Sequence, residues 1–191
     1  MFFRLKLLLS IIFLLPHIIF YFINKKILDY ELPRYDKKTR SCGLKTFVEI
    51  MVKQKVFRNH FYYRIGRKAS FLISWLYPGE STLNISTTRI GRGLHFEHNY
   101  ACIINAQRIG ENFNCLQLVT IGVDKNHKRP VIGNNVTIWT GACVFGDIVI
   151  GDNVNIGANT VINKNVPNNC TVVGNPARIV RLNGEKVNIR L

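Results

Sequence analysis

The sequence predicts a mainly β protein whose second half winds into a triangular coil with one short strand on each side. A six-residue pattern repeats six times without a gap from Ile132 to Pro167. Neither the 3.6-residue period of a helix nor the two-residue period of a strand generates a strict six-residue repeat. An aliphatic residue opens every hexad, and these residues are expected to stack inward as a continuous core: Ile132, Ile138, Val144, Ile150, Ile156 and Ile162.

The hexads continue toward the N-terminus, as IGENFN and CLQLVT from Ile109 to Thr120 and as IGRGLH and FEHNYA from Ile90 to Ala101. Their phase slips by one residue near Arg108. Between Ile121 and Ile132 the spacing is eleven residues instead of six, so residues 122–131 are predicted to leave the coil as an extruded loop. Loops on a regular scaffold often carry function, although a tolerated insertion is the alternative.

At 191 residues the chain has room for this coil and an N-terminal extension, but not for a second catalytic domain. The predicted parts are a hydrophobic membrane-associating segment over 1–26, a basic helical cap over 27–80, the coil over 81–182 and a tail over 183–191. Five cysteines without ligand-like spacing indicate a reducing compartment, the cytoplasm.

An apolar stretch of seventeen residues, Leu7 to Ile23, lies at the short end of the length that spans a bilayer. Pro16 and His17 interrupt it, which suits a kinked, re-entrant or interfacial helix as well as a span. No small-residue cleavage site precedes Asn24, so a removable signal peptide is not expected. The alternative is a helix that packs on the coil or on another subunit.

A basic region follows this stretch directly. Residues 24–68 hold thirteen Lys or Arg against four Asp or Glu, and no nucleic-acid recognition motif accompanies them. We therefore expect no nucleic acid as a partner and an anionic membrane surface instead. If the segment spans, the heavier positive flank places the chain after Ile23 in the cytoplasm. The expected location is the cytoplasm, attached to the inner face of the cell membrane.

Two helices are predicted between the apolar stretch and the coil. Apolar residues at helical spacing indicate an amphipathic helix over 44–56, and a second helix is predicted over 61–75, before Pro78-Gly79. These helices are expected to cap an open end of the coil, because an uncapped coil exposes its backbone edge.

The hexads resemble the left-handed parallel β-helix of the hexapeptide-repeat acyltransferases over residues 84–182. IGRGLHFEH, NCLQLVTIG and the closing GNPARIV from Gly174 to Val180 are most similar to the serine O-acetyltransferase-like branch. The resemblance implies a homotrimer that uses acetyl-CoA and no metal. The helical region ahead of the coil is much shorter than in similar serine acetyltransferases.

The motif Glu97-His98 carries the chemistry that this resemblance implies. His98 stands third in FEHNYA, a position that faces out of the coil. An imidazole can take a proton from a hydroxyl near neutral pH, so His98 is the expected catalytic base, and Glu97 holds the acceptor or tunes the imidazole. A solvent-facing histidine without a role is the alternative. His95 is expected on the surface.

The sequence departs from the family pattern at two positions, which weakens the assignment of the family's catalytic roles to this chain. The Asp that orients this base, in an Asp-Ile-His-Pro stretch, is absent, and the corresponding residues here are Asn84-Ile85-Ser86-Thr87. In the loop, the family places a His directly before Pro, whereas here Arg129 precedes Pro130. His127, two residues earlier, is therefore a second catalytic candidate whose role stays open.

By resemblance, acetyl-CoA lies in a groove between the coils of adjacent subunits. The contacting positions fall on Thr140, Gly141 and Ala158, where small residues let a pantetheine chain approach. Trp139 replaces a Gly and could stack on the ligand or fill a subunit contact. Lys164 and Arg178 are candidates for holding phosphates, with solvated surface charges as the alternative.

These observations predict an acetyl-CoA-dependent O-acetyltransferase. The apolar segment, the basic region and the missing Asp favour a sugar hydroxyl of a cell-surface polysaccharide or its precursor, and serine O-acetylation for cysteine biosynthesis is the alternative. A zinc-dependent lyase would need three His ligands, but His95, His98 and His127 lack the expected spacing. A non-catalytic coil is the remaining possibility.

Overall fold

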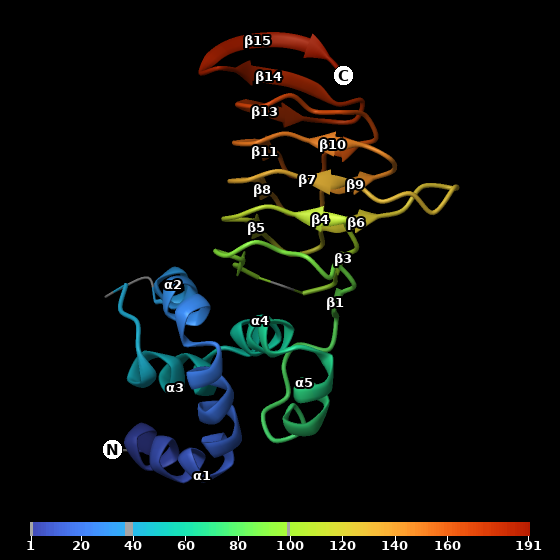
Figure 1. Ribbon diagram of the computed structural model, residues 1–191. Coiled ribbons are helices and arrows are strands. Elements are labelled where there is room, and N and C mark those ends of the chain that lie inside the picture. The colour runs from blue at the N-terminus through green and yellow to red at the C-terminus, as the bar shows by residue number, and fades with distance from the viewer. Residues whose placement is uncertain (1, 37–39, 99) are drawn as a thin grey trace. The chain divides into compact units, whose positions relative to one another are not determined.

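The structure, a computed structural model, describes residues 2–36, 40–98 and 100–191 (Figure 1). The chain divides into two compact units, a helical unit over Met1–Ser81 and a coil unit over Thr82–Leu191. The described residues of the helical unit form α1 (Phe2–Ile23), α2 (Lys25–Tyr35), α3 (Leu44–Lys53), α4 (Lys55–Ile65) and α5 (Arg67–Ile73).

Aromatic side chains dominate the core of the helical unit. Tyr21 of α1 stacks on Phe47 of α3 with ring centroids 4.6 Å apart, and Phe47 meets Phe61 of α4 at 5.2 Å. All three side chains are fully buried. Aromatic pairs of this kind contribute roughly 0.5–1.5 kcal/mol beyond the area that they bury. The core therefore joins α1, α3 and α4.

One face of α1 belongs to this core. Leu14, His17 and Tyr21 are fully buried and lie three or four residues apart, so they share one side of the helix. The apolar segment thus packs on protein through this face, and its partner is the helical unit itself. Among the described residues, no helix is both long enough and apolar enough to cross a membrane. Membrane attachment stays a prediction.

A buried charged cluster connects α2 to α4. His60 Nε2 lies 2.6 Å from Glu31 Oε2, and Arg64 Nη2 donates to Glu31 Oε1 at 2.5 Å. The Tyr35 hydroxyl lies 2.8 Å from His60 Nδ1. Burial alone would raise the pKa of the Glu31 carboxyl, but His60 and the Arg64 guanidinium outweigh it and lower that pKa to about 2. The cluster therefore holds a carboxylate inside the helical unit.

The helices between the apolar segment and the coil differ from the prediction. α3 ends at Lys53, α4 covers the predicted gap, and α5 begins after Gly66. Gly66 has a φ of 86°, which favours glycine and ends α4. Apolar periodicity continues across this break, which is why it did not reveal the end of α4. Capping of the coil by these helices stays a prediction.

Parallel strands build the coil on three faces (Figure 1). Face 1 consists of β1 (Leu83–Ile85), β3 (Cys102–Ile104), β6 (Thr120–Gly122), β9 (Cys143–Phe145) and β12 (Val161–Ile162). Face 2 consists of β4 (Arg108–Ile109), β7 (Val131–Ile132) and β10 (Val149–Ile150). Face 3 consists of β2 (His95–Phe96), β5 (Asn114–Cys115), β8 (Thr137–Ile138), β11 (Asn155–Ile156) and β13 (Cys170–Val173).

The chain visits face 3, face 1 and face 2 in turn, so β2, β5, β8 and β11 open the first, second, third and fourth coils. The predicted parallel β-helix is therefore confirmed. The predicted core row is also confirmed, because the six aliphatic residues from Ile132 to Ile162 are at most 2% exposed. Residues in this row pair in register between coils, as Ile138 with Ile156 and Val144 with Ile162.

Asparagines stack along the corner between face 2 and face 3. Asn112, Asn135, Asn153 and Asn169 have φ values between 54° and 56°, a conformation that Asn tolerates better than most residues. Each side-chain amide donates to the next carbonyl oxygen, at 3.0, 2.9 and 2.8 Å. This ladder joins successive coils through side chains, in addition to their backbone bonds.

The segment predicted as a tail over 183–191 contains a strand, β15 (Glu185–Arg190). β14 (Arg178–Leu182) and β15 (Glu185–Arg190) are antiparallel strands that extend face 3 beyond β13. They are joined at Asn183-Gly184, both of which have positive φ. Asn-Gly is the strongest short-range signal for a tight hairpin, so the sequence contained this information.

Candidate active site

The candidate base His98 lies at the corner between face 3 and face 1, in the first coil. This corner holds five residues, 97–101, between Phe96 and Cys102, whereas the second coil has three residues between Cys115 and Val119. Phe96 pairs with Cys115, so the coils are in register on either side of the longer corner. His98 is exposed and Glu97 is half-buried. The first corner is thus an irregular place in a regular coil.

The small residues predicted to hold the cofactor lie on the same corner, farther along the coil. Thr140 and Gly141 belong to the third coil and Ala158 to the fourth. Backbone bonds stack these corners, since Gly141 N donates to Gln117 O at 3.1 Å and Asn159 N donates to Thr140 O at 2.9 Å. Adjacent coils lie about 4.8 Å apart, so an extended ligand can follow this edge toward His98.

Two features favour glycine at position 141 on this edge. Its φ is 72°, and a Cβ atom there would lie 2.2 Å from Asn159 Oδ1. Trp139, two residues earlier, is 45% exposed beside it. The edge therefore offers a bare backbone flanked by one large aromatic surface.

The structure adds Tyr100 and Gln117 to this corner, two residues that no motif in the sequence indicated. The Tyr100 side chain is exposed, and its carbonyl oxygen accepts from Leu118 N at 2.9 Å. Gln117 Oε1 is buried and accepts no hydrogen bond from any residue that the structure describes. The available signal was the spacing from Phe96 to Ile104, eight residues where the next coil has six.

A cysteine nucleophile does not fit this corner. Cys102 begins β3 next to the longer corner, and hydrogen bonding with the Cys115 thiol lowers the pKa of Cys102 to about 7. However, Cys102 is fully buried inside the coil, and its thiol donates to Leu116 O at 3.2 Å. The exposed histidine is therefore the better-placed group for chemistry on a bound ligand.

The predicted loop leaves the coil between β6 and β7 and projects away from it (Figure 1). Asp124 Oδ1 organises the tip by accepting from the backbone N–H groups of Asn126 and Lys128, both at 2.9 Å. His127 has a φ of 58° at this tip and is exposed. The loop thus presents His127 on a short ordered turn.

His98 and His127 lie at different corners of the triangle. The corner of His98 joins face 3 to face 1, and the loop of His127 joins face 1 to face 2, so a full face separates them. A single chain does not bring them together. A site that contains both histidines needs the loop of a second copy.

Two other residues considered with the candidate base are His95 and Asn84. The expectation that His95 lies on the surface is wrong: the residue is 8% exposed, and its Nδ1 lies 2.7 Å from Asn114 Oδ1. At the position of the family's orienting Asp, Asn84 Oδ1 accepts from Ser86 Oγ at 2.9 Å on β1. A carboxylate is absent from this position.

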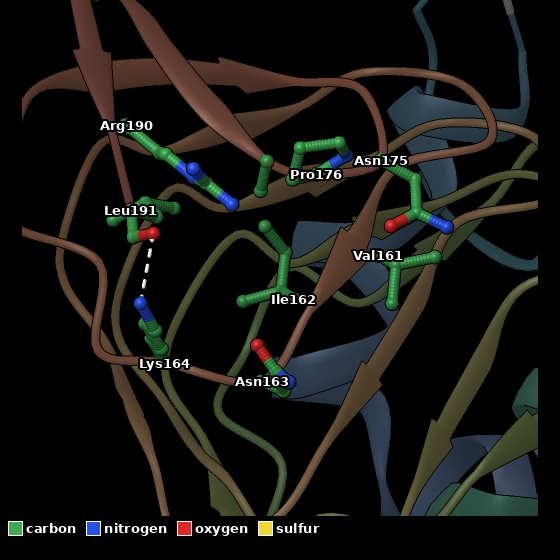
Figure 2. A pocket seen from close by; sticks show the side chains of 9 residues that line it. Val161, Ile162, Asn163, Lys164, Asn175, Pro176, Arg190 and Leu191 are labelled. Carbon is green, nitrogen blue, oxygen red and sulfur yellow. Dashed lines mark hydrogen bonds between the residues drawn. The ribbon is translucent and has the colours of Figure 1, made fainter.

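The two candidate phosphate-binding cations are engaged in the last coils. Lys164 Nζ donates to Leu191 O at 2.9 Å, and Arg178 Nε donates to Asn188 Oδ1 at 2.5 Å. Figure 2 shows Lys164 with Asn163, Pro176, Arg190 and Leu191 around a hollow. The volume of this hollow is about 510 Å³. Lys164 and Arg190 give this hollow a positive lining.

Comparison with known proteins decides the family. Residues 129–164 match the family described as bacterial transferase hexapeptide (six repeats). The serine acetyltransferase of Staphylococcus epidermidis is 34% identical over 154 residues, which cover 78% of this chain and 70% of that protein. The chain belongs to the serine acetyltransferase family of hexapeptide-repeat transferases.

Solved structures of serine acetyltransferases share this fold. The enzyme of Neisseria gonorrhoeae superimposes with a TM-score of 0.66 at 28% identity, covering 86% of this chain and 67% of that one. Its complex with serine gives 0.62 at 28% identity over 83% and 69%. A serine acetyltransferase in complex with CoA gives 0.61 at 26% identity over 84% and 72%.

Coverage differs among the serine acetyltransferases. The enzyme of Staphylococcus xylosus is 43% identical over 103 residues, which cover 52% of this chain and 48% of that protein. The chain thus matches about half the length of that relative. Among the described residues, no group of three or more His, Cys, Asp or Glu side chains is arranged to hold a metal ion.

Proposed function

We propose that this chain is an acetyl-CoA-dependent O-acetyltransferase with His98 as its general base. The observation that carries the proposal is the long corner of the first coil, which exposes Glu97-His98 at one end of an edge of small residues. The family membership supports the same chemistry, because the named relatives are serine acetyltransferases.

The transfer is direct. His98 takes the proton of the acceptor hydroxyl, and the oxygen attacks the carbonyl carbon of the acetyl thioester. The carbon–sulfur bond then breaks, and CoA leaves as a thiol after receiving the proton. Glu97 holds the acceptor or orients the imidazole, a role that gains weight because the position of the family's Asp is occupied by Asn84.

Acetyl-CoA binds along the corner edge in this proposal. Thr140, Gly141 and Ala158 lie beside the pantetheine chain, and Trp139 offers a surface for stacking. Lys164 and Arg178 are proposed to hold the phosphates of CoA. Lys164 lines the hollow in Figure 2 together with Arg190, whereas Arg178 lies outside that lining. His127 reaches the site from the loop of a second copy.

The comparisons favour serine over a sugar as the acceptor. A relative named serine acetyltransferase matches 78% of this chain, and a neighbouring structure holds serine. Serine is therefore the first acceptor to test. The sequence pattern favours a sugar, whereas the comparisons support the alternative, serine, better.

A sugar hydroxyl of a surface polysaccharide or its precursor is the second candidate. Two observations favour it, namely the absence of a carboxylate at Asn84 and the basic helical unit with its apolar first helix. An enzyme with that acceptor would work at the inner face of the cell membrane.

We further propose a homotrimer of left-handed coils. The separation of the corners that carry His98 and His127 supports it, because a site with both histidines needs a second copy and cyclic assembly gives every copy the same neighbour. Sedimentation of the purified chain measures this mass directly. A monomer that turns over acetyl-CoA would contradict the shared site.

The test of the acceptor is thiol release from acetyl-CoA by the purified chain. L-serine and a panel of nucleotide-activated and lipid-linked sugars are compared at matched concentrations. Turnover highest with L-serine is the expected result. Turnover that is highest with a sugar would select the second candidate, and no release with any hydroxyl compound would overturn the enzymatic proposal.

A further inference from the structure

The outward side of α1 is an apolar stripe that the helical unit leaves uncovered. Its members lie at helical spacing and are 54–69% exposed: Ile12, Leu15, Ile19, Phe22 and Ile23. On a helical wheel these residues lie opposite the buried residues Leu14, His17 and Tyr21. A surface helix normally turns a polar face to water, so this stripe is a contact surface.

The surroundings of the stripe are positively charged. Lys25 and Lys26 are exposed at the start of α2, after Asn24, and the ammonium of Lys25 pairs with Asp29. Lys26 therefore supplies the nearest positive charge without that carboxylate. Residues 1–81 together hold fifteen Lys or Arg against five Asp or Glu. An anionic partner therefore gains from both the apolar stripe and the charge around it.

A second exposed group, on α5 and the turn that follows it, repeats this combination. Phe71, Leu72 and Trp75 are 66–83% exposed, and Arg67 and Lys68 are exposed at the start of the same helix. Tryptophan beside cations is typical of side chains at the boundary between lipid and water. Both groups belong to the helical unit (Figure 1).

The charge also decides between an anionic bilayer and a second copy of the same surface. Two copies that meet through α1 would bring two positively charged surroundings together, and like charges disfavour that contact. Anionic lipid headgroups neutralise the cations, and the acyl boundary accepts the apolar side chains.

We propose that the outward stripe of α1 binds the surface of an anionic bilayer, with α1 lying in the plane of the membrane. The buried face of α1 stays on α3 and α4, so only the stripe enters the lipid. This inference gives the proposed membrane location its contact surface. It depends neither on acetyl transfer nor on the choice of acceptor, so either proposal can fail alone.

Co-sedimentation of the purified full-length chain with lipid vesicles tests this surface. Vesicles of phosphatidylglycerol and phosphatidylcholine are compared with vesicles of phosphatidylcholine alone. The double variant Ile19→Ser and Phe22→Ser should lower the partition coefficient on anionic vesicles by at least tenfold, because each change removes an apolar side chain that would leave water. The matched control is Ile189→Ser, which removes an exposed apolar side chain from β15 in the coil unit.

The variant Lys26→Gln tests the contribution of charge to vesicle binding separately from the contribution of the apolar stripe. It should weaken binding to anionic vesicles by roughly fivefold and leave any binding to neutral vesicles unchanged. Circular dichroism shows that each variant is folded before it is scored, and the single variant Ile19→Ser replaces the double variant if the latter unfolds.

Wild-type chain that stays in the supernatant with anionic vesicles would overturn the proposal. Equal loss of binding in Ile189→Ser would also overturn it, because the stripe would then have no special role. If the wild type ignores vesicles and the stripe variant lowers its mass in analytical ultracentrifugation, a second copy of the chain covers α1 instead.

Discussion

The interactions that stabilise the coil unit internally differ in kind from those that stabilise the helical unit internally. In the coil, each strand pairs with its equivalents one coil away, and the same kinds of residue recur at each level. In the helical unit, single contacts between distant residues decide the packing, such as Tyr21 on Phe47 and Glu31 with His60 and Arg64. Repetition gives the protein its scaffold, and the candidate site lies where the repetition fails, at the long first corner and the loop.

The largest expected effect concerns the long corner. His98→Ala should reduce thiol release from acetyl-CoA by about 100- to 10,000-fold, because a general base contributes that range of rate. CoA binding and the oligomeric mass should persist, since an exposed side chain adds little to the coil core. His127→Ala should lose less, roughly tenfold, as expected of a group that positions the reactants. Near wild-type turnover in His98→Ala would remove the base from the mechanism.

The second prediction targets the single contacts of the helical unit. Glu31→Gln removes the charge that faces His60 and Arg64 in a buried site, and breaking such a cluster costs about 3–5 kcal/mol of unfolding free energy. Glu49→Gln is the matched control, because its pair with Lys53 is exposed and is worth about 1 kcal/mol or less. Hydrogen exchange followed by mass spectrometry should show faster opening of α2 and α4 with an unchanged coil.

Equal loss of protection in both units would show that they unfold together, so the comparison between them would not hold. Equal effects of Glu31→Gln and Glu49→Gln would show that burial of the cluster has no special importance.

The third prediction is that acid destabilises the helical unit first. Burial lowers the pKa of His17 to about 4 from its ordinary 6.5, so its contribution is present above pH 6.5 and is lost as the pH falls toward 4. At about 1.4 kcal/mol for each pKa unit, the loss amounts to a few kcal/mol. The Glu31 carboxylate adds a further loss between about pH 4.5 and 2, since its folded pKa also lies below the ordinary value.

Denaturant titrations from pH 7 to 4 measure this loss, with His17→Phe as the variant without the titrating group. The variant should show a flatter dependence over that range. An identical slope in wild type and variant would contradict the assignment to His17.

The smallest expected effect lies in the repetitive part. Asn153→Ala removes two ladder hydrogen bonds and places Ala at a φ of 56°, for a combined cost of about 1–3 kcal/mol. Asn153→Gly removes the same bonds without the conformational strain, so it should cost less. Equal melting temperatures for Asn153→Ala and wild type would show that backbone pairing alone holds this corner.

Much of the coil could be predicted because an inward-facing aliphatic residue recurs at the same spacing along it. The spacing of Ile132, Ile138 and Val144 indicates the inward row directly, and the spacing from Ile121 to Ile132 reveals the loop. The hairpin at Asn183-Gly184 also had a short-range signal in the sequence. The ladder through Asn135 and Asn153 was harder to predict, because its partners lie in neighbouring coils.

The helical unit and part of the site could not be predicted in this way. Nothing in the spacing of Glu31 and His60 indicates that they meet, because twenty-nine residues separate them. The burial of His95 depends likewise on packing, since its neighbours in the sequence suggest an exposed strand. At the site, Glu97-His98 is recognisable as a motif in the sequence. Gln117 carries no such motif, and its place beside the first corner depends on how the first and second corners stack.

The most direct test of the shared site is to mix two defective chains. His98→Ala and His127→Ala chains are co-expressed in equal amounts, and thiol release from acetyl-CoA is compared with that of each variant alone. If one copy supplies the base and the next supplies the loop, random trimers contain intact sites at about one position in four, so about a quarter of wild-type activity should return. Activity equal to the mean of the two separate variants would contradict a site built between two copies.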